Sequence, residues 1–241
     1  MERFDMKISK KIITLIICIF AFGIFSTLAI EIGNDEIFTE PGLENFTKQN
    51  TYTVGLFTDV APSAWYAENV ATAYELGLVK GTSATTFGVS GNITIAETIA
   101  LAARIDSIFY TGQADFVQGT PWYQCYVDYA VEVGIITSSE YSQYNATATR
   151  AQFATILSRA LPSYVLDEIN WIDDGAIPDV KSSDSYGEAV YMLYRAGILT
   201  GSDSEGTFKP QNTISRPEVA AIVTRMADKS LRKSIMLVGE Y

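Results

Sequence analysis

An internal repeat constrains the fold of this chain more than any other feature of its sequence. Three residue pairs each stand twelve residues before a glycine. The pairs are Trp65-Tyr66, Trp122-Tyr123 and Ser185-Tyr186, and the glycines are Gly77, Gly134 and Gly197. Between each pair and its glycine, apolar residues recur at i, i+3 and i+7, which places them on one face of a helix that stops at the glycine. The sequence therefore predicts three equivalent helices.

A second helix is expected in each unit, after a polar loop. Each of these helices has Thr or Ser at the N-cap and Glu or Gln three residues later, which is the capping-box pattern. The boxes are Thr94 with Glu97, Thr149 with Gln152, and Ser215 with Glu218. One helix pair of this size cannot bury its own apolar faces, so the three units must share a core. The expected fold class is all-α, with three tandem helix-loop-helix units.

Two of the second helices begin with an arginine. Arg150 and Arg216 occupy the first helical position, where the helix dipole disfavours a cation by about 0.3–1 kcal/mol. A bound anion would account for them, because free backbone N–H groups and a guanidinium can grip one carboxylate or phosphate together. The alternative is that each arginine pairs with a nearby Asp or Glu. Ile95 stands at this place in the first unit, which would then lack the grip.

These motifs resemble the S-layer homology (SLH) domain. The resemblance rests on Phe57-Thr58-Asp59-Val60, on Gly77-Leu78-Val79-Lys80-Gly81, and on the run from Gly206-Thr207-Phe208 to Ile214-Ser215-Arg216-Pro217-Glu218. It covers residues 57 to about 227, and the second unit is degenerate because its loop lacks the glycines. The resemblance implies three tandem SLH repeats that form a pseudo-threefold helical bundle, with ligand grooves between neighbouring repeats.

The expected organisation of the chain follows from these units. Residues 1–29 form a signal peptide, and residues 30–56 form a polar leader or spacer with little order. SLH repeat 1 covers residues 57–109, the degenerate repeat 2 covers 110–163, and repeat 3 covers 164–227. For the C-terminal tail, residues 228–241, the sequence leaves packing, pairing and disorder open.

The N-terminal segment has the features of a secretory signal. Cations precede an apolar run from Ile12 to Ile24, and Thr27-Leu28-Ala29 is a plausible cleavage site. An uncleaved membrane anchor is the competing interpretation, since the apolar run could extend to Ile30. A lipoprotein site at Cys18 is rejected, because Ile17 stands where a small residue is expected. Export is expected in either case.

Composition excludes several classes of function. The chain contains no histidine, which excludes His-based triads, imidazole proton shuttles and His metal sites. Once Cys18 is removed, Cys125 alone can form neither an intramolecular disulfide nor a thiolate metal site. The formal net charge of −11 makes nucleic acid a poor partner. An anionic wall polymer would also be repelled on average, so binding one requires locally placed Arg and Lys. No cofactor, metal site or catalytic residue is expected.

The resemblance also implies a function. SLH repeats typically hold exported proteins noncovalently on the cell wall by binding secondary cell wall polysaccharide, often through a pyruvyl ketal whose carboxylate suits a guanidinium. The expected glycan contacts are the carboxylate-binding Arg150 and Arg216, the sugar-stacking Trp65 and Trp122, the hydroxyl-binding Asp59 and Asp179, and the backbone around Lys80, Gly81, Thr82, Gly201 and Ser202. Each has a structural alternative: core anchors for the tryptophans, turn or cap residues for the aspartates, and helix stops for the glycines.

Two other functions are weighed against wall anchoring. Assembly with itself or with an S-layer would make another surface protein the partner and glycan binding secondary. A glycosidase acting through two carboxylates is disfavoured, because no Asp or Glu pair stands in a recognisable catalytic pattern and the repeats occupy nearly the whole chain. The expected protein is therefore secreted, non-catalytic and located at the cell wall, with membrane contact only through an uncleaved signal segment.

Overall fold

The computed structural model describes residues 40–237 of the chain. The predicted signal peptide, residues 1–29, lies outside the described residues. The described part contains six α-helices and three short 3-10 helices, and it contains no β-strand. Within the same residues, no helix is both long and apolar enough to cross a membrane. The predicted all-α class is confirmed.

The six α-helices occur where the repeat predicts them. The first helices of the three units are α2 (Ala67–Glu75), α4 (Gln124–Glu132) and α6 (Gly187–Arg195). The second helices are α3 (Ile95–Thr111), α5 (Arg150–Leu157) and α7 (Arg216–Ala227). The 3-10 helices are η1 (Leu43–Asn45), η2 (Ser163–Val165) and η3 (Lys229–Leu231).

Local chemistry explains both ends of these helices. Gly77, Gly134 and Gly197 have φ values of +69°, +79° and +70°, the left-handed conformation that glycine adopts without steric cost. At the start of α3, the Thr94 hydroxyl accepts the Glu97 N–H while the Glu97 carboxylate accepts the Thr94 N–H. The start of α5 repeats this arrangement. At α7, the N–H and hydroxyl of the N-cap serine both donate to the Glu218 carboxylate.

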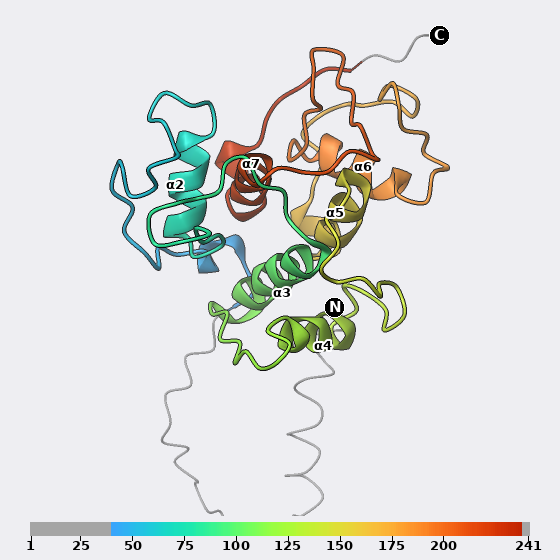
Figure 1. Ribbon diagram of the computed structural model, residues 1–241. Helices are drawn as coiled ribbons and strands as arrows, with labels where there is room; N and C mark the ends of the chain where they lie inside the picture. The colour runs from blue at the N-terminus through green and yellow to red at the C-terminus, as the bar shows by residue number, and fades with distance from the viewer. Residues whose placement is uncertain (1–39, 238–241) are drawn as a thin grey trace, which may run out of the picture. The chain divides into compact units, whose positions relative to one another are not determined.

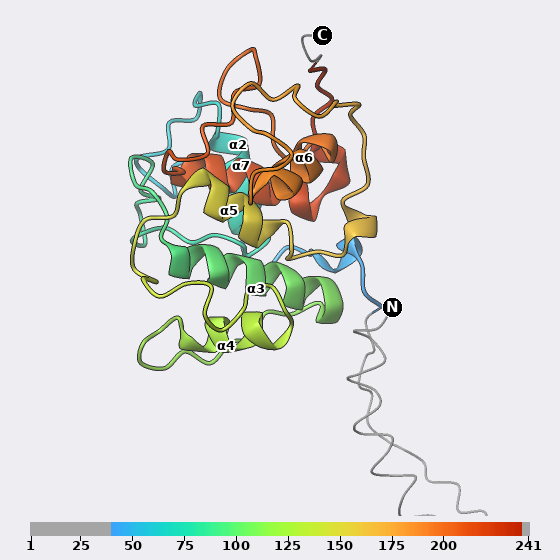
Figure 2. The ribbon, with the colours of Figure 1, turned by 90° about the vertical axis from the view of Figure 1, so that its right-hand side faces the viewer.

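Helices from neighbouring units pack against each other. α2 of unit 1 packs on α7 of unit 3, α4 of unit 2 packs on α3 of unit 1, and α6 of unit 3 packs on α5 of unit 2. Figures 1 and 2 both show α4 lying beside α3. The three contacts form a closed cycle, so each unit buries its apolar residues against both of the others.

Backbone hydrogen bonds close the same cycle at the starts of the second helices. The Ile95 N–H of unit 1 donates to the Ala146 carbonyl of unit 2 over 2.9 Å, and the Arg150 N–H of unit 2 donates to the Asn212 carbonyl of unit 3 over 2.8 Å. The Arg216 N–H of unit 3 completes the ring by donating to the Gly91 carbonyl of unit 1 over 3.0 Å. Helix N-termini leave their first N–H groups without partners inside the helix, and here the neighbouring unit supplies the acceptors.

The expectation of little order before residue 57 is wrong for residues 40–56. The Asn45 side-chain amide donates to the Phe109 carbonyl over 2.8 Å, and Phe46 is buried. The Asn50 side-chain amide donates to the Tyr74 carbonyl at the end of α2, as Asn170 does to Tyr194 at the end of α6. Residues around Asn50 therefore play the same part in unit 1 as residues around Asn170 play in unit 3.

The first ten residues of the C-terminal tail are also packed. The Arg232 guanidinium is buried and donates to the Val165 carbonyl over 2.9 Å. The Ile235 N–H donates to the Asn170 side chain, and Ile172 pairs with Leu237 through the backbone. Residues 228–237 thus lie along residues 165–172, which precede α6.

Two aspartates fix the loops between the helices. The Asp59 carboxylate accepts hydrogen bonds from the N–H groups of Phe87, Gly88 and Val89 over 2.7–3.0 Å. Asp179 accepts the N–H groups of Phe208 and Lys209 in the same way. Burial alone would raise the pKa of Asp59, but the backbone N–H groups outweigh it and the pKa lies below its usual 3.8.

We predict that Asp59→Asn destabilises the protein by about 1–2 kcal/mol, because an amide cannot replace a carboxylate that accepts three N–H groups. Since the folded-state pKa of Asp59 is depressed, its contribution is complete above about pH 4 and is lost as the pH falls through the lower folded value. Urea unfolding between pH 3 and pH 7 should show a flatter acid dependence in the variant. Asp115→Asn, which alters an exposed carboxylate without such bonds, is the control. Equal behaviour of the two variants would contradict this role.

Candidate functional site

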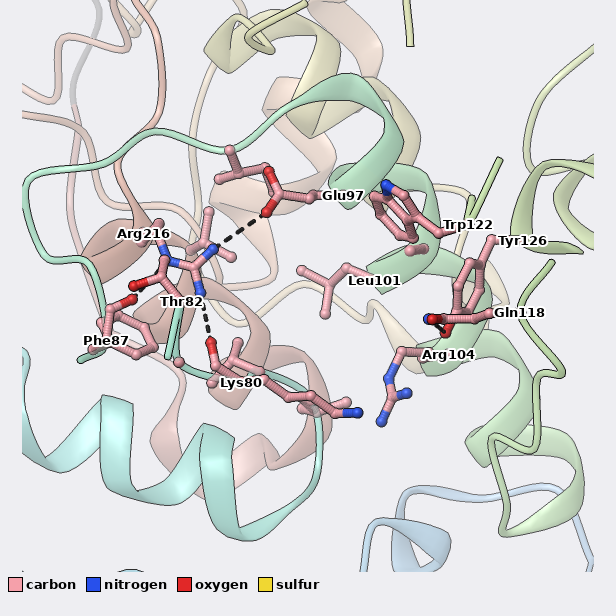
Figure 3. Close-up of a pocket in the computed structure, with 16 residues that line it drawn as sticks. Lys80, Thr82, Phe87, Glu97, Leu101, Arg104, Gln118, Trp122, Tyr126 and Arg216 are labelled. Atoms are coloured by element: carbon pink, nitrogen blue, oxygen red, sulfur yellow. Dashed lines mark hydrogen bonds and ion pairs between the residues drawn. The ribbon is translucent and has the colours of Figure 1, made fainter. Parts of the chain in front are cut away.

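A cleft of about 260 Å³ lies where the three units meet. Unit 1 contributes the loop after α2 and one face of α3, unit 2 contributes the start of α4, and unit 3 contributes the start of α7. The lining includes Lys80, Gly81, Thr82, Glu97, Leu101, Arg104, Gln118, Trp122, Tyr126 and Arg216, and Figure 3 shows most of these side chains. Five of the predicted glycan-binding residues therefore come together in one cleft: Lys80, Gly81, Thr82, Trp122 and Arg216.

Arg216 lines the cleft, but most of its guanidinium is used within the protein. Nε donates to the Phe87 carbonyl over 2.9 Å, and Nη2 donates to the Lys80 carbonyl over 2.5 Å. Nη1 faces the Glu97 carboxylate at 3.4 Å, and the guanidinium carbon lies 5.1 Å from the centre of the Phe87 ring. Arg216 therefore joins the start of α7 to the loop of unit 1, and this joint forms one wall of the cleft.

Arg150 makes the equivalent joint between units 2 and 3, away from this cleft. Its side chain is only 6% exposed; Nε donates to the Phe208 carbonyl over 2.6 Å, and Nη1 pairs with Glu218 at 2.5 Å. Burial would raise the pKa of Glu218, but Ser215 and Arg150 outweigh it and lower that pKa. The structure thus gives Arg150 the carboxylate partner that the sequence offered as the alternative. Its contact with a glycan stays a prediction, which this burial disfavours.

The two predicted tryptophans lie in different surroundings. Trp122 is 39% exposed and lines the cleft. Trp65 holds the equivalent position in unit 1, is 64% exposed and packs edge-to-face on Tyr66. Neither is a buried core anchor, so that alternative is wrong for both.

The predicted glycines are required by their own loops. A Cβ on Gly81 would come within 2.6 Å of the Ser83 and Thr86 carbonyls and of the Phe57 ring. Gly201 has a φ of +85° and faces the backbone of Gly206 equally closely. The neighbouring Thr82 hydroxyl and Ser202 N–H bond within these same loops. Asp59 and Asp179 anchor the loops, as described above, and contact of any of these residues with a glycan stays a prediction.

The sequence analysis missed several residues of the cleft, and Arg104 is the most informative of them. One of its Nη2 hydrogens is donated to the Gly77 carbonyl. The equivalent residues are Arg159, two residues beyond the end of α5, and Arg225 in α7, and they donate to the Ile135 and Ile198 carbonyls. The signal was present as an arginine nine residues after the first residue of each second helix.

A second hollow of about 520 Å³ continues from the cleft toward residues 114–118. Four residues line both hollows: Lys80, Arg104, Gln118 and Tyr126. The Gln118 amide donates to the Tyr126 hydroxyl over 3.1 Å. Within residues 40–237, no group of three or more His, Cys, Asp or Glu side chains could hold a metal ion. The cleft therefore presents cationic groups, hydrogen-bond donors and an apolar surface to a ligand.

Two segments of the chain match a known protein family. The family model of the S-layer homology domain matches residues 56–99 and 176–220, which lie in units 1 and 3. SLH domains anchor S-layer proteins and surface enzymes to the cell wall. The match indicates that this chain is located at the cell surface.

Three curated relatives extend the similarity beyond the two matched segments. A surface-layer 125 kDa protein of Lysinibacillus sphaericus is 28% identical over 183 residues, covering 70% of this chain and 15% of the relative. An endoglucanase of a Bacillus species (strain KSM-635) is 26% identical and covers 76% of this chain and 19% of the relative. Exoglucanase XynX of Acetivibrio thermocellus is 27% identical, with 72% and 16% covered. The chain thus spans less than a fifth of the length of each.

We predict that Arg150→Met lowers the free energy of unfolding by about 2–3 kcal/mol, because Glu218 and the Phe208 carbonyl lose a partner in a largely buried site. Denaturant titration followed by circular dichroism measures the change. Arg159→Met is the matched control, since that guanidinium is 43% exposed and its ion pair with Glu140 is expected to contribute at most about 1 kcal/mol. If both substitutions cost the same, the structural role assigned to Arg150 is wrong.

Proposed function

We propose that the chain binds secondary cell wall polysaccharide in the cleft between its units and so holds itself, or what it carries, noncovalently on the wall. The observation that carries this proposal is the character of the cleft. Lys80, Arg104 and Arg216 gather around it in a chain whose formal net charge is −11. A local concentration of cations against an acidic background favours an anionic ligand at this one place.

The other walls of the cleft suit a sugar with an apolar acidic substituent. Trp122 offers a partly exposed ring face, and Leu78, Ala100 and Leu101 form an apolar floor. A pyruvyl ketal carries both a carboxylate and a methyl group, so it could place its charge toward the arginines and its methyl against the leucines. We propose the pyruvylated form of the polysaccharide on this ground.

We infer that residues 110–163 are a third, degenerate SLH repeat. The family model does not match them, but they take their place in the helix cycle and in the ring of backbone hydrogen bonds like the other two units. The relatives align with 70–76% of the chain, whereas the two matched segments make up well under half of it. The boundaries proposed are those expected from the sequence, with residues 40–56 packed on repeat 1.

We place the role of this region in binding rather than in catalysis. It resembles segments of a surface-layer protein, an endoglucanase and an exoglucanase, and each segment is a small part of its protein. A segment that recurs beside such different activities is better explained by a task that these proteins share. Anchoring at the cell surface is such a task.

Assembly with an S-layer is a second candidate function, favoured by the surface-layer relative. In that case the partner would be a surface protein, and glycan binding would be secondary. Light scattering of the purified secreted protein separates the two. A monomer that sediments with isolated walls supports anchoring, whereas ordered assembly without wall binding supports the lattice role.

We predict that Trp122→Ala weakens sedimentation with isolated cell walls about tenfold, which corresponds to about 1.4 kcal/mol of lost contact with a sugar ring. Tyr164→Ala, which removes a side chain of η2 that is 68% exposed, is the control and should bind as the wild type does. Trp65→Ala tests the equivalent junction in the same assay. Unchanged binding by Trp122→Ala would contradict the cleft as the binding site. Loss of binding in Trp65→Ala alone would place the binding site beside Trp65 instead.

A further inference from the structure

Two cations at the mouth of the cleft have no acidic partner among residues 40–237. Figure 3 shows the ammonium of Lys80 and the guanidinium of Arg104 pointing toward one another, and both side chains line the two adjoining hollows. No carboxylate of residues 40–237 lies within 4.0 Å of either group. Asp115 lines the second hollow and is not paired with them. Two like charges that face each other are unfavourable unless an anion lies between them.

Hydrogen-bonding capacity is also concentrated at this point. Arg104 is held in place by the Gly77 carbonyl. Within residues 40–237 it keeps most of its five N–H groups for other partners, and the Lys80 ammonium keeps all three of its own. The hydroxyl of the buried Tyr126 accepts from Gln118, and its own hydrogen makes no hydrogen bond within the described residues. Arg216, by contrast, already bonds two carbonyls and faces Glu97. The donors available to a ligand are therefore those of Lys80 and Arg104 rather than those of Arg216.

The equivalent positions of units 2 and 3 do not reproduce the pair of cations that Lys80 and Arg104 form in unit 1. Thr137 and Thr200 stand where unit 1 has Lys80. Arg159, the counterpart of Arg104 in unit 2, pairs with Glu140 at 2.9 Å, and burial lowers the pKa of Arg225, the counterpart in unit 3. Among the described residues, the unpaired combination of an ammonium and a guanidinium occurs at one of the three junctions.

We propose that Lys80 and Arg104 form an oxyanion-binding site that takes the acidic group of a sugar residue, with Tyr126 and Gln118 as neutral donors beside it. The planar fork of Arg104 can bind two oxygens at once, and the Lys80 ammonium adds a point charge. Arg216 is then a positioning residue that builds the cleft. This assignment rests on the proposed binding of wall polysaccharide, because it names which residues hold the acid of that ligand.

The test uses isolated cell walls and the purified secreted protein with Lys80→Gln or Arg104→Gln. Each substitution should weaken sedimentation at least tenfold. Lys80→Arg should retain most of the binding because it keeps the charge, whereas Arg104→Lys should fall between the wild type and Arg104→Gln because it keeps the charge and loses the planar fork. Lys181→Gln, which removes another exposed charge, and Arg159→Gln, which removes the counterpart of Arg104, should bind as the wild type does. Thermal unfolding should shift no more in Arg104→Gln than in Arg159→Gln, since both lose a bond to a helix-end carbonyl and Arg159 also loses its ion pair with Glu140.

Soluble competitors identify the source of the oxyanion. A 4,6-pyruvylated methyl glycoside, a methyl glucuronide and glucose 6-phosphate should displace the wild type to different degrees, and the strongest competitor names the acid. A neutral methyl glycoside should not. The assignment is overturned if both glutamine variants bind walls as the wild type does, if the control substitutions weaken binding equally, or if no acidic competitor acts. Failure of the wild type to bind walls would instead overturn the proposed function itself.

Discussion

The ring of backbone hydrogen bonds at the starts of α3, α5 and α7 is the constraint on which the rest of the structure depends. A helix N-terminus must place its first N–H groups on some acceptor, and in this protein each start uses a carbonyl of the next unit. The capping boxes satisfy further N–H groups within each unit. Three separate helical starts are therefore held at one place, and the loops that precede them are held with them.

This ring explains why an arginine stands where the helix dipole disfavours it. At the first position of α5 and α7, the arginine side chain is directed at the next unit. The loop of that unit presents a carbonyl and an aromatic face, and its second helix presents the Glu of its capping box. These contacts more than offset a dipole cost of about 0.3–1 kcal/mol. The sequence correctly marked both arginines as unusual. It could not distinguish a bound anion from the protein's own oxygens, because both satisfy the same guanidinium.

Features that depend on nearby residues could be predicted, and features that depend on the packing of distant ones could not. The stops at Gly77, Gly134 and Gly197 and the boxes at each second helix were predictable because a turn and a cap are fixed within a few residues. The ordered structure of residues 40–56 could not be predicted, since it depends on Asn45 and Asn50 reaching carbonyls far along the chain. Arg104 escaped notice for the same reason: its place in a cleft requires residues of three units to converge.

The net charge of the chain makes the position of its few cations decisive. At physiological ionic strength, exposed charges are screened beyond about 8 Å, so the acidic surface repels a polyanion at long range but contributes little at contact. At the mouth of the cleft Lys80 is exposed and Arg104 is half-buried, and the apolar side chains of Leu101 and Trp122 line the same cleft. A charge-assisted hydrogen bond to the half-buried Arg104 is stronger than one on an open surface. Attraction can then outweigh repulsion only for an acid that enters the cleft. If the chain binds wall polysaccharide as proposed, such an arrangement selects the polymer by the substituent that it presents, rather than by the charge that it carries along its length.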